Sequence, residues 1–344
     1  MINIKKITLA IFLCFQSCME PDADNLWSIL IENVFETKGF ARSVTFDGEK
    51  AYVAAGQSGL QIWDLEDYTL MHDFKGYEEG GTFLEFEDIA LIRRDSANSL
   101  IFLSESNQDV KIFHFDGSDT LEYRNTIMSA RTKDFISFHS GNDQFVMYSA
   151  DNDDGMKWHY YNLDTTSAFG IEFINWTPFG GSEIYTPGKP LGIDSDGESV
   201  IAMAVDQLGV ELFSINFLGD DPVFIGRVDT DGNAENVLLD TDGIYVSSRN
   251  AGGYFISYSC FESEICEKYN FARDYDVNHI SIFGEIALLS LRDDGIAIYK
   301  INDNDQPEFK GSFDIGYVYK TEIWDEKIIA CMQEGLLIFS IENQ

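Results

Sequence analysis

Basic residues are scarce in this chain, which has 23 lysines and arginines against 59 aspartates and glutamates in 344 residues. The formal net charge is −36. A field of this sign repels the phosphates of nucleic acids and anionic lipid headgroups, so we expect no nucleic-acid partner. It favours cations, basic partners and solubility in saline surroundings.

Long hydrophobic runs and helical periodicity are also missing. Beyond the N-terminal region, no apolar run is long enough to cross a bilayer as a helix. Short strand-like runs separated by turn residues take the place of helical patterns with caps. The sequence therefore predicts an all-β protein.

Linear motifs of known chemistry are lacking too. The chain has no Gly-x-Ser-x-Gly elbow, no phosphate-binding glycine loop and no histidine pair with metal-ligand spacing. Its five histidines are scattered along the sequence. We therefore assign no catalytic residue from a motif and expect no cofactor, apart from structural calcium as considered below.

The N-terminal region has the organisation of a secretory signal. Two lysines precede an apolar run at residues 7–15, and Ser17 and Cys18 follow at a candidate cleavage site. Ser17-Cys18 resembles a bacterial lipobox, with Phe15 and Gln16 departing from its usual residues. The resemblance implies lipidation at Cys18; ordinary cleavage nearby with an incidental cysteine is the alternative.

This interpretation divides the chain into three parts. We expect a lipoprotein signal peptide at residues 1–17, an acidic tether at residues 18–25 and one folded domain at residues 26–344. The protein would be exported and lipid-anchored to the outer membrane or cell surface of a Gram-negative type of cell. The lipid would be its only contact with the membrane.

The later cysteines agree with export. Cys260 and Cys266 flank five residues between two strand-like runs. In an oxidising compartment this spacing suits a disulfide across a hairpin, and two free thiols are the alternative. Cys331 lies in an apolar run and is expected to be a buried thiol.

The most informative feature is a sequence motif, here called the repeated phrase, that recurs about every forty to fifty residues. In its first copy, residues 42–46 and 50–55 are strand-like and flank an Asp47-Gly48 turn. Residues 60–64 supply a third strand and residues 68–74 a fourth. Seven copies align on a third-strand anchor, from Gly59-Leu60 to Gly335-Leu336. Four short antiparallel strands per copy predict one blade of a β-propeller.

The two ends of the sequence predict how the ring closes. The last copy ends after its third strand, and residues 26–35 form a lone strand-like run before the first copy. If this run pairs with the last blade, it supplies the missing fourth strand and removes an open sheet edge. We predict a single closed β-propeller of about seven four-stranded blades, with six or eight as alternatives.

The repeated phrase resembles the LVIVD repeat. The match is carried by Ala41-Arg42-Ser43-Val44, Ala51-Tyr52-Val53-Ala54 and Gly59-Leu60-Gln61-Ile62-Trp63-Asp64. It is strong in the first copy, fair in the fourth to seventh and poor in the second and third. The resemblance implies an exported or surface-located propeller and brings no catalytic motif with it.

Alignment of the copies predicts a site. The first strand of each propeller blade lines the central channel, and six of the seven residue pairs aligned with Arg42-Ser43 are polar. Symmetry would gather them near one mouth of the channel, where they could bind a small polar ligand or an ion. A water-filled channel with mutually satisfied salt bridges is the alternative. The candidates are Arg42, Asp88, Lys133, Asp134, Glu235, Asn236, His279 and Lys320.

Two loops add further candidates. Asp151, Asp153 and Asp154 form the densest acidic loop, which predicts either a weak calcium site or a solvated turn. An insertion at residues 162–188 is rich in aromatic residues, and insertions in repeats map to loops on one face. We expect Trp176 and Phe179 of this insertion to be exposed contact residues.

Two classes of function remain. The first is a non-catalytic, surface-tethered binding module whose partner is an unknown protein or a small polar ligand at the cell envelope. The second is a hydrolase or lyase with a polar site at the channel mouth, in which His279 acts with Asp88 or Asp134 as acid and base.

Overall fold

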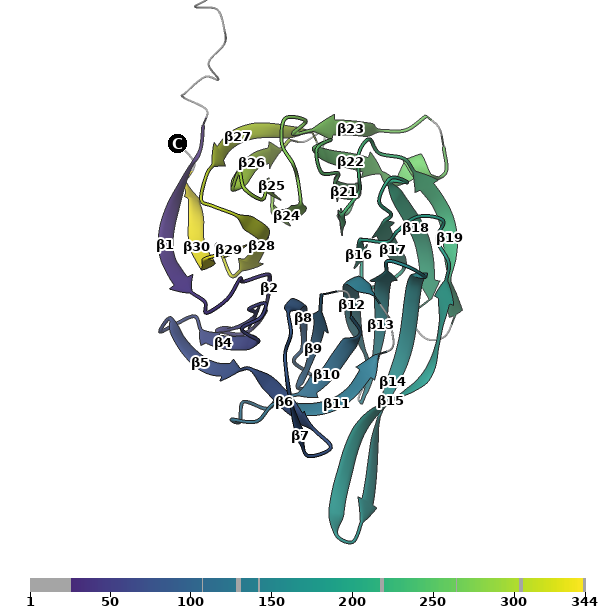
Figure 1. Ribbon diagram of the computed structural model, residues 1–344. Helices are drawn as coiled ribbons and strands as arrows, with labels where there is room; N and C mark the ends of the chain where they lie inside the picture. The colour runs from purple at the N-terminus through teal and green to yellow at the C-terminus, as the bar shows by residue number, and fades with distance from the viewer. Residues whose placement is uncertain are drawn as a thin grey trace, which may run out of the picture.

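The repeat copies fold into seven sheets of mainly antiparallel strands arranged in a ring, which Figure 1 shows face-on. The structure is a computed structural model that describes residues 26–106, 108–127, 131–141, 143–216, 220–263, 265–302 and 306–342. The predicted all-β, seven-bladed propeller is confirmed. Residues 1–25, with the predicted signal peptide, Cys18 and the acidic tether, lie outside the described residues.

The first blade follows the sequence prediction to within about one residue. It consists of β2 (Ser43–Asp47), β3 (Lys50–Ala54), β4 (Leu60–Asp64) and β5 (Thr69–Phe74) in that order. Four further blades repeat the pattern. These are formed by β12 (Thr132–Gly141), β13 (Gln144–Asp151), β14 (Gly155–Ala168) and β15 (Ile171–Ile184); β16 (Gly192–Ser195), β17 (Val200–Ala204), β18 (Val210–Asn216) and β19 (Asp220–Val228); β20 (Asn236–Leu239), β21 (Gly243–Ser247), β22 (Gly253–Ser257) and β23 (Lys268–Phe271); and β24 (His279–Phe283), β25 (Ile286–Ser290), β26 (Ile296–Ile301) and β27 (Pro307–Phe313).

The last blade is completed from the other end of the chain, as predicted. Its own strands are β28 (Val318–Trp324), β29 (Lys327–Met332) and β30 (Gly335–Glu342). The N-terminal strand β1 (Ser28–Glu36) pairs antiparallel with β30, from Ser28 opposite Glu342 to Glu36 opposite Gly335. Because β1 covers the outer edge of β30, the ring closes through backbone hydrogen bonds.

The glycine at or just before the third strand recurs in the repeated phrase for a steric reason. Gly59, Gly209 and Gly295 adopt φ angles of 86°, 77° and 77°, a region that favours glycine. A Cβ atom on any of them would lie 2.1–2.2 Å from a carbonyl oxygen of the blade's fourth strand. At Gly335 the crowding carbonyl belongs to Phe35, at 1.9 Å, so β1 occupies the place of a fourth strand.

The second blade departs from four strands. Its own strands are β8 (Ile89–Asp95), β9 (Leu100–Glu105), β10 (Val110–His114) and β11 (Glu122–Ile127), and an extra hairpin of β6 (Gly76–Glu79) and β7 (Thr82–Glu85) precedes them. β6 joins β11 in parallel at a single pair, Glu122 opposite Glu78. The sheet therefore has six strands.

The third blade contains the predicted insertion as a long hairpin. β14 and β15 pair as far as Ala168 opposite Ile171 and project from the ring at the bottom of Figure 1. Phe179 is 56% exposed, as expected, but Trp176 is only 2% exposed and packs on Phe145 with ring centroids 5.1 Å apart. The prediction that Trp176 is an exposed contact residue was therefore wrong, because the residue belongs to the core between the second and third blades.

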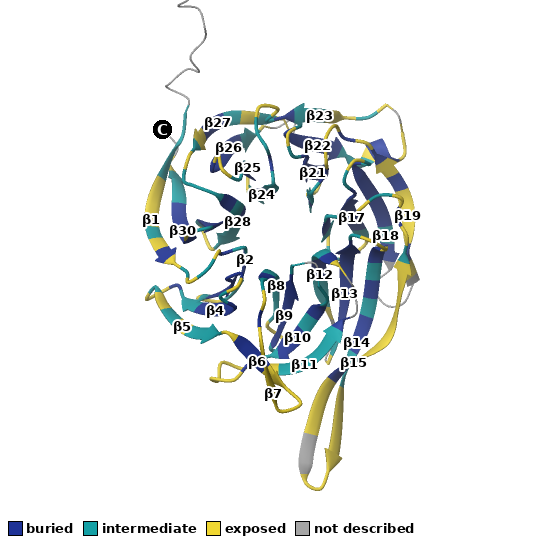
Figure 2. Cartoon of the chain, viewed as in Figure 1, coloured by how far each residue is buried: buried dark blue, intermediate teal, exposed yellow. Residues whose placement is uncertain are grey.

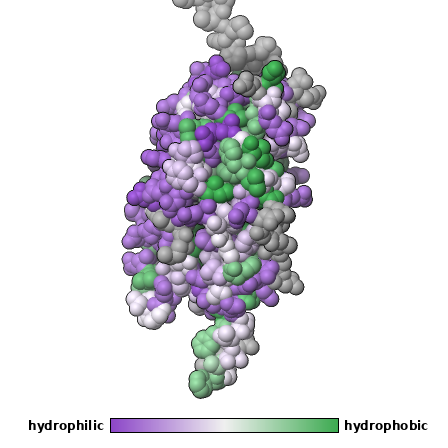
Figure 3. All heavy atoms as spheres, turned by 90° about the vertical axis from the view of Figure 1, so that its right-hand side faces the viewer, coloured by the Kyte–Doolittle hydropathy of each residue, from purple (hydrophilic) through white to green (hydrophobic). Residues whose placement is uncertain are grey.

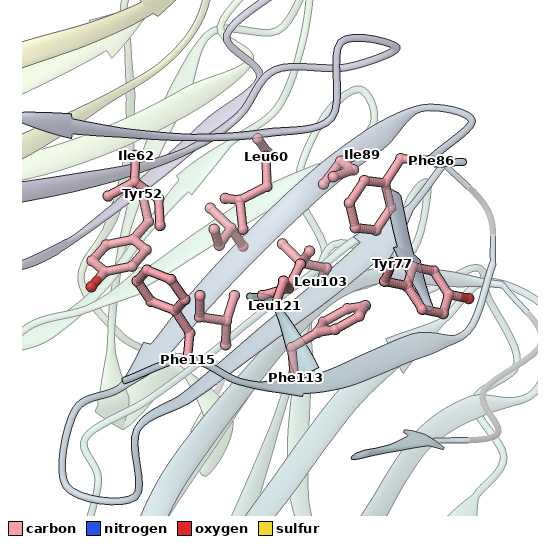
Figure 4. Close-up of a cluster of buried hydrophobic side chains, with 13 residues drawn as sticks. Tyr52, Leu60, Ile62, Tyr77, Phe86, Ile89, Leu103, Phe113, Phe115 and Leu121 are labelled. Atoms are coloured by element: carbon pink, nitrogen blue, oxygen red, sulfur yellow. The ribbon is translucent and has the colours of Figure 1, made fainter. Parts of the chain in front are cut away.

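The hydrophobic core lies between neighbouring blades. Figure 4 shows one cluster, in which Tyr52, Leu60 and Ile62 of the first blade face Phe113 and other residues of the second. The second strands of the blades, such as β3 and β9, are almost completely buried, whereas the outermost strands are mostly intermediate or exposed, as Figure 2 shows. Burial of each large side chain contributes about 2 kcal/mol, so each blade depends on its neighbours for stability.

The disulfide and the buried thiol predicted from the cysteine positions are both present. Cys260, in the short helix η2 (Tyr258–Phe261), forms a disulfide with Cys266, which precedes β23. Cys331 is a buried free thiol in β29. The described part of the chain contains no apolar helix of membrane-spanning length.

Candidate functional site

The first strands of six blades enclose a central cavity of about 590 Å³. Its walls come from β8, β12, β16, β20, β24 and β28 together with the residues just before some of these strands. Six of the eight candidates predicted for the channel mouth line this cavity, namely Lys133, Asp134, Glu235, Asn236, His279 and Lys320. Arg42 and Asp88 do not line it and belong to a separate pocket.

Three ionisable side chains of the cavity were missed by the sequence prediction. Arg93, Asp194 and Glu322 also line its walls. Arg93 and Glu322 lie two positions from the lining residues Leu91 and Lys320 on the same strands. Because side chains of a strand alternate between faces, every second residue beyond the aligned pair was a candidate as well.

Lys320 and Glu322 form an ion pair on one strand. Lys320 Nζ lies 2.5 Å from Glu322 Oε1, and the Lys320 side chain is almost completely buried. Burial alone would raise the pKa of Glu322, but the charge of Lys320 and the nearby His279 and Arg93 lower it below its ordinary value. Glu322 is therefore a carboxylate at neutral pH.

Asp134 is held by a cation and by backbone donors. Arg93 Nη2 lies 3.5 Å from Asp134 Oδ1, and the backbone N–H groups of Phe135 and Ile193 donate to the carboxylate at 2.9 and 3.3 Å. Burial is the largest influence and raises the pKa of Asp134 above its ordinary value despite these partners. Arg93 thus joins the second blade to the third across the cavity wall.

Asp194 has a backbone partner and a strongly shifted pKa. Its Oδ2 atom accepts from Leu239 N–H at 2.8 Å, which links the fourth and fifth blades. Burial raises the pKa of Asp194 to about 6, and the nearby Asp134 contributes to the rise. Part of the acidic character of the cavity is therefore lost in mildly acidic solution.

His279 is a neutral imidazole in the cavity. Burial, together with the charges of Lys320 and Arg93, lowers its pKa to about 3, while Glu322 acts in the opposite direction. Its Nδ1 atom is buried and has no hydrogen-bond partner among the described residues. The ring therefore supplies polar atoms without a positive charge.

Glu235 lies at the mouth within a cluster of four charged side chains. Arg249 contacts both of its carboxylate oxygens, at 2.9 and 3.0 Å, and Arg292 Nη2 lies 3.4 Å from Oε2. Asp276 Oδ1 lies 3.1 Å from Arg249 Nε. Burial raises the pKa of Glu235, and Arg249 limits the rise.

The positions of the two arginines follow from turn geometry. Arg249 and Arg292 have φ angles of 51° and 57°, as Gly56 and Asp206 do at 58° and 44° in equivalent turns. Each of these residues forms a backbone bridge to the start of the next blade's first strand. Alignment of the second turn of each copy, rather than its first strand, would have predicted these mouth residues.

Arg42 and Asp88 form a second group at the first two blades. Arg42 Nη2 lies 3.1 Å from Asp88 Oδ2, and Ser106 Oγ bridges the pair at 3.2 and 2.8 Å. They line a pocket of about 280 Å³ with Lys38, Gly39, Phe40, Gln57 and Ser58. The eight candidates thus divide between two adjoining sites and do not form a single ring.

The three carboxylates of the acidic loop at Asp151–Asp154 form ion pairs with two cations of the same blade. Lys157 Nζ lies 2.7 Å from Asp154 and 3.5 Å from Asp151, and Arg131 Nε lies 3.1 Å from Asp153. Within the described ranges, no group of three or more acidic, histidine or cysteine side chains is arranged to hold a metal ion. These contacts fit the turn that was the alternative to calcium.

Comparisons with known proteins support the fold alone. No protein-family model matches the chain, so its likeness to the LVIVD repeat rests on the residues quoted above, and no curated protein matches it. Among solved structures, the computationally designed Ika8 protein is 9% identical with a TM-score of 0.60, covering 91% of this chain and 99% of that one. The structure of U3-55K is 9% identical with a TM-score of 0.65 and covers 92% and 98% of the two chains. The chain shares its fold with these propellers.

Proposed function

We propose that this chain is a non-catalytic binding module of the cell envelope, built on LVIVD-type repeats and tethered by a lipid on Cys18. The observation that carries the binding proposal is the central cavity. Its volume of about 590 Å³ lies within the range of small-molecule sites, and its walls carry charges of both signs beside a neutral histidine and amides. A small polar ligand would find both donors and acceptors there.

The predicted catalytic alternative has weaker support from the chemistry of its residues. A general base works best when its pKa lies near the operating pH, but the pKa of His279 is about 3. Its two predicted acid partners are engaged elsewhere, Asp88 with Arg42 and Asp134 with Arg93. A neutral imidazole among paired ions is better suited to binding than to proton transfer.

The binding proposal can be tested with a panel of small polar probes. The full chain is titrated by calorimetry with representative amino acids, dicarboxylates, neutral sugars and polyamines. We expect at least one class to bind, and we expect Glu322→Gln to weaken that binding because it unpairs Lys320. Glu308→Gln is the matched control, since Glu308 and Lys310 form a similar pair, at 2.7 Å, on the outer strand β27.

The outcomes separate the two functions. Recovery of the bound probe unchanged after prolonged incubation supports the module. Conversion of a probe by wild-type protein and not by His279→Ala would support the hydrolase or lyase instead. If no class binds, or if Glu322→Gln and Glu308→Gln behave alike, the cavity is not the binding site.

The anchor and the hairpin have their own tests. Mass spectrometry of the mature protein should find a lipidated Cys18 as its first residue, and an unmodified later start would refute the anchor. Phe179, exposed on the β14–β15 hairpin, remains a contact candidate for a protein partner. The hydrophobic colours on the projection at the bottom of Figure 3 mark the end of this hairpin.

A further inference from the structure

Three aromatic side chains lie at the mouth, between its two ion-paired groups. Phe40, Tyr317 and Tyr319, here called the aromatic platform, come from the connection before β2 and from the start of β28. The rings of Tyr317 and Tyr319 are 4.8 Å apart, and those of Phe40 and Tyr319 are 6.4 Å apart. Phe40 is 48% exposed, so its ring is available to a ligand.

The platform connects the two groups of charges. The Arg42 guanidinium lies over the Tyr319 ring, 5.9 Å from its centroid. Tyr317 interacts electrostatically with Arg249, Asp276 and Glu235 at the other side. Burial raises the pKa of both tyrosines, so their hydroxyls stay protonated and can donate as well as accept hydrogen bonds.

The ion-paired charges at the mouth are equal in number, although the whole chain carries a net charge of −36. The carboxylates of Asp206 and Asp293, which have no ion pair among the described residues, also act on Glu235 and Tyr317. Arg42 pairs with Asp88, and Arg249 and Arg292 face Glu235 and Asp276. These side chains are about a quarter to a third exposed, so their outer edges remain accessible. The ion pairs therefore offer planar donors and acceptors with no excess charge among themselves.

This arrangement restricts the chemistry of a ligand. A charged ligand would compete with a partly buried pair and leave one member without its partner, which is costly. A wholly apolar ligand would remove water from the ions without replacing their hydrogen bonds. A neutral, hydroxyl-rich ligand avoids both costs, because each hydroxyl can donate to a carboxylate and accept from a guanidinium.

We propose that the aromatic platform and its flanking ion pairs bind a neutral saccharide. The sugar ring lies with its C–H face on Phe40, beside the Tyr319 ring that Arg42 covers, and its hydroxyls reach Arg42 and Asp88. The adjoining pocket of about 280 Å³ is close to the lower limit for small-ligand sites and would accept part of such a ligand. This inference rests on the proposed binding function and names its ligand class.

The test uses the full chain and defined hexasaccharides as probes. Neutral hexamers of glucose with α-1,4, β-1,4 and β-1,3 linkages and a neutral mannose hexamer are compared with a galacturonic acid hexamer by calorimetry. We expect a neutral hexamer to bind and Phe40→Ala to weaken its binding about tenfold, which corresponds to about 1.4 kcal/mol. Phe40→Trp keeps an aromatic face and should retain binding.

Phe83→Ala is the matched control, because Phe83 is similarly exposed, at 55%, but lies on β7 of the extra hairpin. It should bind the neutral hexamer as wild type does. Failure of every neutral hexamer, or equal affinity of Phe40→Ala and wild type, would overturn the saccharide proposal. The cavity proposal would survive if an ionic probe bound with sensitivity to Glu322→Gln and not to Phe40→Ala.

Discussion

Arg249 holds Glu235 at the channel mouth through one nitrogen, Nη1, which lies 2.9 and 3.0 Å from the two carboxylate oxygens. Both side chains are about a quarter exposed. Removal of the cation would leave a largely desolvated carboxylate with only the longer contact to Arg292. The pair therefore stabilises the fold as well as shaping the mouth.

We expect Arg249→Met to lower the free energy of unfolding by about 1–3 kcal/mol, the cost of an unsatisfied polar group. Urea unfolding followed by tryptophan fluorescence measures the change. Lys38→Met is the control, because Lys38 pairs with Asp73 at an exposed position, where the loss should stay below about 1 kcal/mol. Equal losses in the two variants would contradict the structural role of Arg249.

Asp194 in β16 and Asp196 in the turn after it should respond to pH in opposite directions. The pKa of Asp194 is about 6 in the folded state, above its ordinary 3.8. The folded state therefore favours the protonated carboxyl, and the stability that this group contributes is lost as pH rises through 6. Asp194→Asn keeps an oxygen for Leu239 N–H. We expect the variant to become more stable than wild type between pH 4 and 7, by on the order of 2 kcal/mol.

Asp196 supplies the opposite case. Burial tends to raise its pKa, but the backbone N–H groups of Glu198, Ser199 and Val200, at 2.8–2.9 Å, lower it overall. The contribution of Asp196 to the free energy of unfolding is therefore present at neutral pH and is lost as pH falls through its lowered pKa. Asp196→Asn should destabilise the protein at pH 7, with the deficit shrinking in acid. Thermal unfolding of both variants from pH 4 to 7 should show changes of opposite sign, and parallel curves would refute the assignment.

Ring closure depends on one face of β1. Phe35 is 3% exposed and packs between Trp63 and Tyr68 of the first blade, whereas the adjacent Val34 is 55% exposed. Phe35→Ala should cost about 3–5 kcal/mol, while Val34→Ala should stay within about 0.5 kcal/mol. Chemical denaturation measures both. A small loss for Phe35→Ala would mean that β1 is not required for closure.

The disulfide should contribute modestly. Cys260 and Cys266 are separated by six positions, so the bond closes a short loop and should stabilise the protein by about 2 kcal/mol. Reduction of wild type and replacement of both cysteines by alanine should shift the unfolding midpoint equally. Further loss on reduction of the double variant would show that the reductant acts elsewhere.

The sequence predicted repeated structure better than irregular structure. The strands of the first copy and β1 were found to within about two residues, because turn glycines and alternating residues report local geometry directly. The extra hairpin β6–β7 was missed because its residues lack the repeated phrase. Trp176 was misplaced because sequence alone does not show how far an insertion continues a blade before it leaves it.

The site was predicted in part for a similar reason. Aligned first strands located six residues of the cavity, since the propeller's symmetry carries each position to the channel. Symmetry does not determine which charges pair, and the pairing of Arg42 with Asp88 separates them from the cavity. Two of the three residues of the aromatic platform, Phe40 and Tyr317, lie in connections before β2 and β28, so an alignment of strands alone could not reveal it.

Closure by β1 also has a consequence for the order of folding. Ser28 and Glu342 are opposite each other in the finished sheet, although 314 positions separate them in the chain. β1 precedes the blades in the chain and must therefore wait for β30, which follows them, and this long-range pairing is expected to be slow. Until then, intermediate forms would expose the unpaired edges of β1 and of the blades already formed, and a chaperone that shields them would increase the yield of folded protein.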